Sequence, residues 1–279
     1  MRNIATNTRS TLRATVFGSV VVGVICVALA APVLAFASRS TKTVVVHSFG
    51  SANAVCPKGE HVGFGGFVSP RRKGLPVVGE GMRLTAPDRW TVYGASLSAG
   101  RSGSLSAVAY CDHGTTGPRV ASKTVPLVGT GTAIATCPAG TVVVGGGYNS
   151  AAIPMHAEYV QRLERVGLTQ WRVTMINVGL PTTMTAYAFC SGGVAPKLAS
   201  ATVKVPGDGV NTTAQVSCPK GTALVGGGFV ENGTGGLDVV PQRLTAASTT
   251  QWVVAGYGVF VYLNGNSHAA TLTALAYCR

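Results

Sequence analysis

The amino-acid sequence predicts an all-β fold, and three observations support this prediction. Glycine is abundant, with 37 residues, and small and β-branched residues dominate, whereas aromatic residues make up only 7% of the chain. Beyond the first forty residues, no stretch shows the i, i+3, i+4, i+7 apolar spacing of a helix, and short Val- and Thr-rich runs are separated by Gly and Pro. One motif also recurs three times at a constant interval. The chain is therefore expected to form three tandem, disulfide-stapled, β-sandwich-like repeats.

The recurring motif begins at a Cys-Pro turn. Its three copies are CPKGEHVGFGGF from Cys56, CPAGTVVVGGGY from Cys137 and CPKGTALVGGGF from Cys218, and they start 81 residues apart. Trp90, Trp171 and Trp252 keep the same interval. This regularity divides the chain into a leader at 1–37, repeat 1 at 38–118, repeat 2 at 119–199 and repeat 3 at 200–279. The names repeat 1, repeat 2 and repeat 3 refer to these ranges below.

The leader has the features of a secretory signal. The start MRNIATNTRSTLR contains three arginines and no acid, and an apolar run follows as far as Ala37. Ala35-Phe36-Ala37 supplies the small-x-small cleavage pattern. The alternative is an uncleaved N-terminal anchor, because the apolar run is long enough to span a bilayer. In both cases the remainder lies outside the cytoplasm, and after cleavage no membrane span is expected.

Each repeat is expected to contain six strands. The first is a TVxV-type run at 43–46, 124–127 and 202–205, and a second leads into the Cys-Pro-x-Gly turn, where Pro and Gly favour a tight turn. The third contains the glycines, the fourth an Arg-Leu pair, the fifth begins at the tryptophan, and the sixth ends at a second cysteine. The connection between the third and fourth strands differs most between repeats, which makes it the expected place for recognition.

The three consecutive glycines suggest a phosphate loop, but the residues after them do not. A phosphate loop leads into a helix and usually continues with Lys and Ser or Thr. Here each triplet continues with an aromatic residue and a strand-like segment, and Phe64 replaces the first glycine of repeat 1. Glycines within a strand mark a bulge or the close approach of a backbone or a large ring. We therefore expect them to accommodate the tryptophan of the repeat.

Six cysteines remain after the leader, two in each repeat. An even number outside the cytoplasm predicts disulfides. The same pairing in each repeat leaves two schemes, one within the repeats and one between them, and the first is favoured because a small unit gains most from its own cross-link. The favoured pairs are Cys56–Cys111, Cys137–Cys190 and Cys218–Cys278, and the alternative pairs are Cys111–Cys137, Cys190–Cys218 and Cys278–Cys56.

The chain is basic and carries few charges. The formal net charge is +13, and loss of the three leader arginines leaves +10. Such a balance suits contact with anionic polymers, although solubility alone also accounts for it. The candidate ligand-binding residues are an arginine before the tryptophan of each repeat and a basic run in repeat 1. The guanidinium groups of the three recurring arginines could bind sulfate, phosphate or carboxylate. The structural alternative is that each of these arginines closes a turn by binding backbone carbonyls or stacks on the nearby tryptophan. The candidate residues are Arg83, Arg162 and Arg243, and Arg71, Arg72 and Lys73.

Nothing in the sequence predicts catalysis, a cofactor or a metal. No histidine recurs at an equivalent place, and no GxSxG or HExxH motif is present. A site could be built from one repeat alone, for example from His61, His113 and Asp112 in repeat 1, but as a metal site these residues lack a fourth ligand. The sequence therefore favours a protein that is not an enzyme.

The set CPxGTxxxGGGF, QRL, W and TAxAxC resembles a repeat of uncharacterised secreted proteins of actinobacteria. It covers essentially the whole chain after the leader, with departures at Glu60-His61 and Phe64. The resemblance implies secretion and an all-β repeat, but no ligand. A weaker similarity to the vitelline membrane outer layer proteins implies an alternative architecture, a closed pseudo-threefold β-prism.

The function expected from the sequence is multivalent attachment to a glycan or an anionic wall polymer at or beyond the cell surface. The alternative is a structural or adaptor subunit that binds another secreted protein, and nucleic acid is not expected as a partner.

Overall fold

The computed structural model describes residues 36–70, 77–96, 102–113, 116–151, 158–206, 209–233, 237–260 and 270–279. Within these ranges every regular element is a β-strand, so the all-β prediction is confirmed. The candidate residues Arg71, Arg72 and Lys73, and nearly all of the leader, lie outside the described residues.

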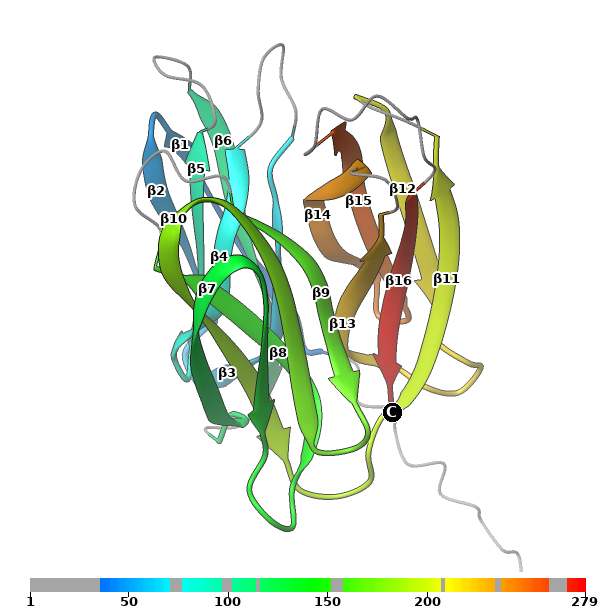
Figure 1. The fold of residues 1–279 in the computed structure, drawn as a ribbon. Coiled ribbons are helices and arrows are strands. Elements are labelled where there is room, and N and C mark those ends of the chain that lie inside the picture. The colour runs from blue at the N-terminus through cyan, green and yellow to red at the C-terminus, as the bar shows by residue number, and fades with distance from the viewer. Residues whose placement is uncertain are drawn as a thin grey trace, which may run out of the picture. The chain divides into compact units, whose positions relative to one another are not determined.

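The strands form two sheets (Figure 1). The six-stranded sheet has the order β1 (Ser38–Val46), β6 (Gly103–His113), β3 (Glu60–Val68), β14 (Leu237–Ser248), β15 (Gln251–Phe260) and β12 (Asn211–Ser217). The ten-stranded sheet has the order β11 (Lys197–Val205), β16 (Ala270–Cys278), β13 (Leu224–Asn232), β9 (Glu158–Val166), β10 (Gln170–Ser191), β8 (Val142–Ser150), β4 (Val77–Ala86), β5 (Arg89–Ser96) and β2 (Phe49–Val55), with β7 (Arg119–Thr136) paired to β10.

The predicted strands form where the sequence alternates or becomes wholly apolar. In β2 and β12 buried residues alternate with exposed ones, as expected for strands with one face against a core. The last strand of each repeat is buried on both faces at its end, as in β16, which lies between β11 and β13 (Figure 1). Repeat 2 differs from the predicted six strands, because its first two strands merge into β7 and its last two merge into β10.

Short strand pairings connect each repeat to the other two. In each of them the end of a glycine-containing strand pairs with the Arg-Leu strand of the preceding repeat, and repeat 1 pairs in this way with repeat 3. The connections therefore run round a closed cycle, and the repeats share their sheets instead of forming separate units. The paired positions are Phe67–Val68 with Leu244–Arg243, Gly81–Met82 with Asn149–Tyr148, and Phe229–Val230 with Leu163–Arg162.

The tryptophan of each repeat lies in the core against the central glycine of its own repeat. All three indole rings are completely buried. A Cβ atom at Gly65, Gly146 or Gly227 would overlap the ring of Trp90, Trp171 or Trp252, respectively. The expected role of the glycines, space for a large ring, is thereby confirmed for the central position of the triplet.

The last glycine of each triplet lies where two repeats meet. A Cβ atom at Gly66, Gly147 or Gly228 would collide with a backbone carbonyl oxygen of the preceding repeat in the cycle. The carbonyl oxygens of Gly66 and Gly228 also accept hydrogen bonds from Trp90 Nε1 and Trp252 Nε1, at 3.0 and 3.1 Å. The triplet therefore serves the packing within a repeat and the packing between repeats.

The aromatic residue before each closing cysteine makes a second contact between repeats. Tyr110 accepts a 2.6 Å hydrogen bond from the Ala246 amide of repeat 3, and Tyr277 accepts one of 2.7 Å from the Arg165 amide of repeat 2. Phe189 packs edge-to-face on Trp90 of repeat 1, with ring centroids 5.7 Å apart. Each ring is buried, so these contacts extend the same cycle.

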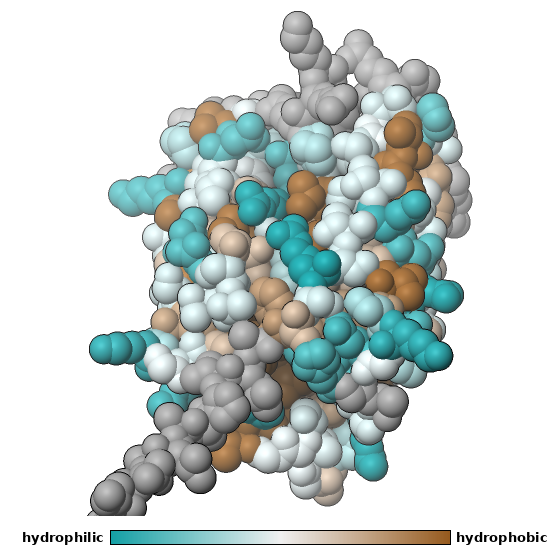
Figure 2. Space-filling view, turned by 180° about the vertical axis from the view of Figure 1, so that it is seen from behind, coloured by the Kyte–Doolittle hydropathy of each residue, from teal (hydrophilic) through white to brown (hydrophobic). Residues whose placement is uncertain are grey.

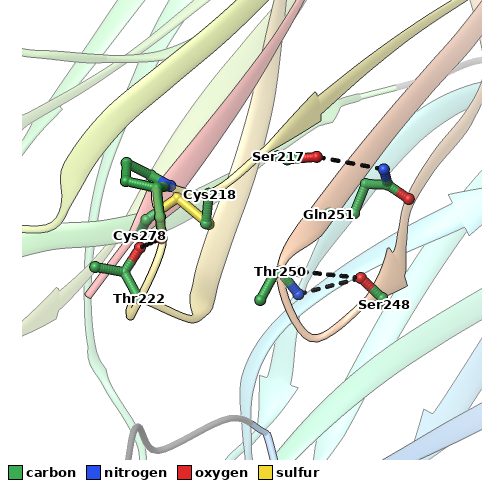
Figure 3. The surroundings of a disulfide bond; sticks show 8 residues. Ser217, Cys218, Thr222, Ser248, Thr250, Gln251 and Cys278 are labelled. Carbon is green, nitrogen blue, oxygen red and sulfur yellow. Dashed lines mark hydrogen bonds between the residues drawn. A yellow bond between two sulfur atoms is a disulfide. The ribbon is translucent and has the colours of Figure 1, made fainter.

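The cysteines pair within the repeats, which confirms the favoured scheme. The three disulfides are Cys56–Cys111, Cys137–Cys190 and Cys218–Cys278. Figure 3 shows the third, next to the Cys-Pro turn, in which Thr222 Oγ1 donates a 2.7 Å hydrogen bond to the Pro219 carbonyl. The first and third disulfides join a strand of one sheet to the end of a strand of the other, because β2 and β6, and β12 and β16, lie in different sheets.

Phe36 and Ala37 form part of the folded body, although the sequence places them in the leader. The Ala37 amide donates a 2.7 Å hydrogen bond to the Cys111 carbonyl, and the Phe36 ring lies 4.9 Å from that of Tyr110 and 5.9 Å from that of Phe64.

Cleavage after Ala37 would remove this ring from its packing. If the leader is cleaved, we therefore expect N-terminal sequencing and intact mass of the mature protein to give a first residue at or before Phe36. A mature chain that begins at Ser38 would contradict this expectation.

Candidate functional site

A pocket of about 450 Å³ lies where the three repeats converge, near the start of their glycine-containing strands. Two sets of equivalent positions contribute to its wall. One residue comes from each of β3, β8 and β13, namely Gly63, Val144 and Val225, and one follows each closing cysteine, namely Asp112, Ser191 and Arg279. The remaining lining residues are His61, Thr116, Gly117, Pro118, Arg119, Thr141, Cys190 and Gly192.

Positive charge on the pocket wall comes from two exposed arginines. Arg119 begins β7, and Arg279 follows the last cysteine. Arg279 Nη2 donates a 2.6 Å hydrogen bond to the Val194 carbonyl, which fixes the direction of its guanidinium group. Planar guanidinium groups bind carboxylate, phosphate and sulfate through paired hydrogen bonds. The pocket is therefore suited to an anionic group.

Asp112 and His61 are half-buried on the same wall. The Asp112 carboxylate lies against Gly63, since a Cβ atom at Gly63 would overlap it. Burial raises the pKa of Asp112, and a positive charge on the neighbouring His61 opposes this rise. The pocket wall therefore carries one carboxyl group beside the two arginines.

Two of the three hydroxyl groups of the wall, those of Thr141 and Ser191, are engaged with the backbone. Thr141 Oγ1 donates a 2.6 Å hydrogen bond to the Pro138 carbonyl, and Ser191 Oγ donates one of 3.3 Å to the Gly192 carbonyl. A nucleophilic hydroxyl would instead donate to a base.

The structure brings together two of the three residues singled out in repeat 1. His61 and Asp112 both line the pocket, whereas His113 is exposed and its Nδ1 lies 3.8 Å from Glu60 Oε1.

The three predicted arginines each contact their own protein. Arg83 lies between two tyrosine rings and donates hydrogen bonds to the hydroxyls of Tyr187, at 2.8 Å, and Tyr93, at 3.3 Å. Arg162 donates to Asn232 Oδ1 at 2.7 Å. Arg243 Nε donates to Thr245 Oγ1 at 2.7 Å. None of these contacts is to a backbone carbonyl or to a tryptophan, so they differ from the structural role that the sequence suggested, and a ligand-binding role stays a prediction.

The strand register also shows that Arg83 is not equivalent to the other two, so the expected threefold set is wrong. Arg162 and Arg243 lie opposite the residue three positions after the tryptophan of their repeat, whereas Arg83 lies opposite the residue one position after Trp90. Gly81 occupies the equivalent place in repeat 1. The Leu-to-Trp interval is two residues shorter in repeat 1, so aligning the Arg-Leu pairs shifts the register.

Sequence reasoning missed the two arginines of the pocket. Arg279 stands where the other repeats have Asp112 and Ser191. Arg119 lies opposite the closing cysteine of its repeat, where repeat 3 has Lys197 and repeat 1 has Ser38. Neither arginine recurs in all three repeats, so the repeat pattern gave them no weight. The signal that could have found them is that each follows a closing cysteine in the sequence. In a closed cycle of repeats, the segments that follow three equivalent disulfides come together.

In the described residues, no group of three or more His, Cys, Asp or Glu side chains could hold a metal ion. No helix in the same part of the chain is long and apolar enough to cross a membrane. Comparisons with protein-family models and with curated proteins give no match for this chain.

Proposed function

We propose that this is a secreted, non-catalytic protein that binds an anionic polymer at or beyond the cell surface, and that the pocket lined by Arg119 and Arg279 holds an acidic group of that polymer. The observation that supports it most directly is the pair of guanidinium groups on one concave wall. The three disulfides fit an oxidising environment outside the cytoplasm, and the net charge of +10 that remains after loss of the three leader arginines favours the approach of a polyanion.

The face seen in Figure 2 does not favour a large apolar interface. On the face seen in Figure 2, hydrophobic side chains (brown) are interspersed with hydrophilic ones (teal) and form no continuous area. Large contiguous apolar patches are typical of protein-binding surfaces.

Binding should depend on the charge of the pocket. We expect Arg119→Gln with Arg279→Gln to lower the affinity for polygalacturonate at least tenfold in low salt, because two charge-assisted contacts are lost. Isothermal titration with polygalacturonate, dextran sulfate and uncharged dextran measures this.

A matched control removes two charges elsewhere. Lys42 and Arg89 are exposed and do not line the pocket. If Lys42→Gln with Arg89→Gln weakens binding as much as the pocket variant does, or if neither polyanion binds the native protein, the proposed function fails.

A further inference from the structure

A set of buried polar positions lies six residues beyond the pocket along the glycine-containing strands. Ser69, Ser150 and Glu231 are 81 residues apart and lie at or next to the ends of β3, β8 and β13. A second set, Glu80, Gln161 and Gln242, has the same interval and occupies the register shifts of β4, β9 and β14. Five of the six are buried, and Gln161 is half-buried.

Each member of the first set meets a member of the second across a connection between repeats. The Ser69 amide donates to the Gln242 carbonyl at 2.7 Å, and Ser150 Oγ donates to the Glu80 carbonyl at 3.2 Å. The Glu231 carboxylate accepts a hydrogen bond from the Gln161 side chain. The three pairs therefore close the cycle at the end of the repeats away from the pocket.

The first set also fastens the base of the variable connection in its own repeat. Ser69 Oγ donates to the Val77 carbonyl, and Glu231 Oε2 accepts a 3.2 Å hydrogen bond from the Val239 amide. In both cases the partner is eight residues later, on the far side of the connection. This connection is where the sequence places recognition.

Two of the three pairs contain a carboxyl group, and one contains none. Glu80 and Glu231 are each 2% exposed, and Glu80 Oε2 is buried without a hydrogen-bond partner. The equivalent pair between repeats 1 and 3, Ser69 with Gln242, has no ionisable side chain.

The groups that face these two carboxyls are acidic or neutral. Glu158 of β9 and the Tyr148 hydroxyl of β8 face Glu80, and Asp238 of β14 and Gln161 of β9 face Glu231. The Tyr159 hydroxyl of β9 faces Asp238. Within the described part of the chain, neither Glu80 nor Glu231 forms an ion pair with a base.

We propose that Glu80 and Glu231 make the contacts between adjacent repeats a proton-dependent clamp, in which the buried carboxyls are tolerated while they are protonated and the contacts loosen when they ionise. Ionisation would place one charge beside Glu158 and one beside Asp238, each in a buried site. The clamp acts independently of the ligand pocket.

The direction in which pH changes the stability follows from the protonation of Glu80 and Glu231 in the folded and the unfolded chain. Burial, with Glu158 or Asp238 as the second cause, raises the pKa of Glu80 and of Glu231 from 4.5 to about 8. Between these values the folded chain retains protons that the unfolded chain releases, so stability falls as pH rises from 4.5 to about 8 and changes little outside this window on their account.

Thermal unfolding of the full secreted protein between pH 4 and 9 tests the clamp. For the native protein, we expect the midpoint to fall by roughly 3 °C per pH unit for each carboxyl within the window. Glu80→Gln with Glu231→Gln should flatten this dependence and raise the midpoint at pH 8. Gln242→Glu, which places an acid in the neutral pair, should steepen it.

Two results would overturn the proposal. One is a doubly substituted protein that keeps the native pH dependence. The other is a native protein labelled with ¹³C at the glutamate carboxyls in which no glutamate titrates well above its usual pKa, a measurement that needs no variant to fold.

Discussion

Alanine at Gly146 is expected to prevent stable folding. The new methyl group would overlap the Trp171 ring, which is completely buried and packs edge-to-face on Tyr277 of repeat 3 with centroids 5.8 Å apart. Relief of the overlap would displace the indole and the contact between repeats at the same time. Overpacking of this kind costs about 3 kcal/mol or more where no flexible side chain can move aside. Urea unfolding monitored by tryptophan fluorescence, together with the yield of folded protein, measures the effect.

Gly192 provides the matched control for this substitution. A Cβ atom there would meet no atom within 4 Å, and its φ lies outside the left-handed region. Gly192→Ala should change the free energy of unfolding by less than about 0.5 kcal/mol. Equal stability of the Gly146→Ala and Gly192→Ala proteins would show that the glycine triplet does not accommodate the indole.

The contact between the triplet and the tryptophan was predictable because both features recur at the same interval. A glycine that repeats with a tryptophan indicates a shared steric requirement, and the structure shows that requirement at Gly65, Gly146 and Gly227. The disulfide pairing was predictable for the same reason, since only pairings repeated in each unit had to be considered.

The pairing between repeats was not predictable, because it leaves almost no pattern in the sequence. Each connection involves two residues per strand, as in Phe67–Val68 with Leu244–Arg243. A pattern of alternating burial can be recognised only in a longer strand. Phe67, Val68 and Leu244 would also suit the core of a single repeat, so their residue types do not indicate a partner in another repeat. Their partners became visible only with the register of the whole sheet.

The candidate pocket escaped prediction because its charged residues differ from repeat to repeat. The positions after the closing cysteines are Asp112, Ser191 and Arg279, which share no chemistry. The prediction that Arg83 is equivalent to the other two arginines was wrong for the opposite reason. A similar tripeptide occurs in all three repeats, but the shorter interval to Trp90 places Arg83 two positions further along β4. Local similarity is thus a weaker guide to equivalence than distance from a buried tryptophan.

Loss of any one disulfide should destabilise the whole cycle of repeats. The three cross-links close chain segments with sequence separations of 55, 53 and 60. For loops of this size the chain-entropy model gives about 4 kcal/mol each. Because every repeat pairs with both others, the loss is expected to lower one cooperative unfolding transition instead of melting a single repeat.

The double substitution Cys56→Ala with Cys111→Ala tests whether the repeats unfold together. The Cys56–Cys111 disulfide joins the two sheets through β2 and β6, which both belong to repeat 1. We expect urea unfolding of this variant to show one transition at a lower midpoint, with all three tryptophans reporting it together. A native sample in which mass spectrometry finds no free thiol provides the control. Separate transitions for the three repeats would show that they fold independently despite their shared sheets, because a cross-link confined to one repeat would then protect that repeat alone.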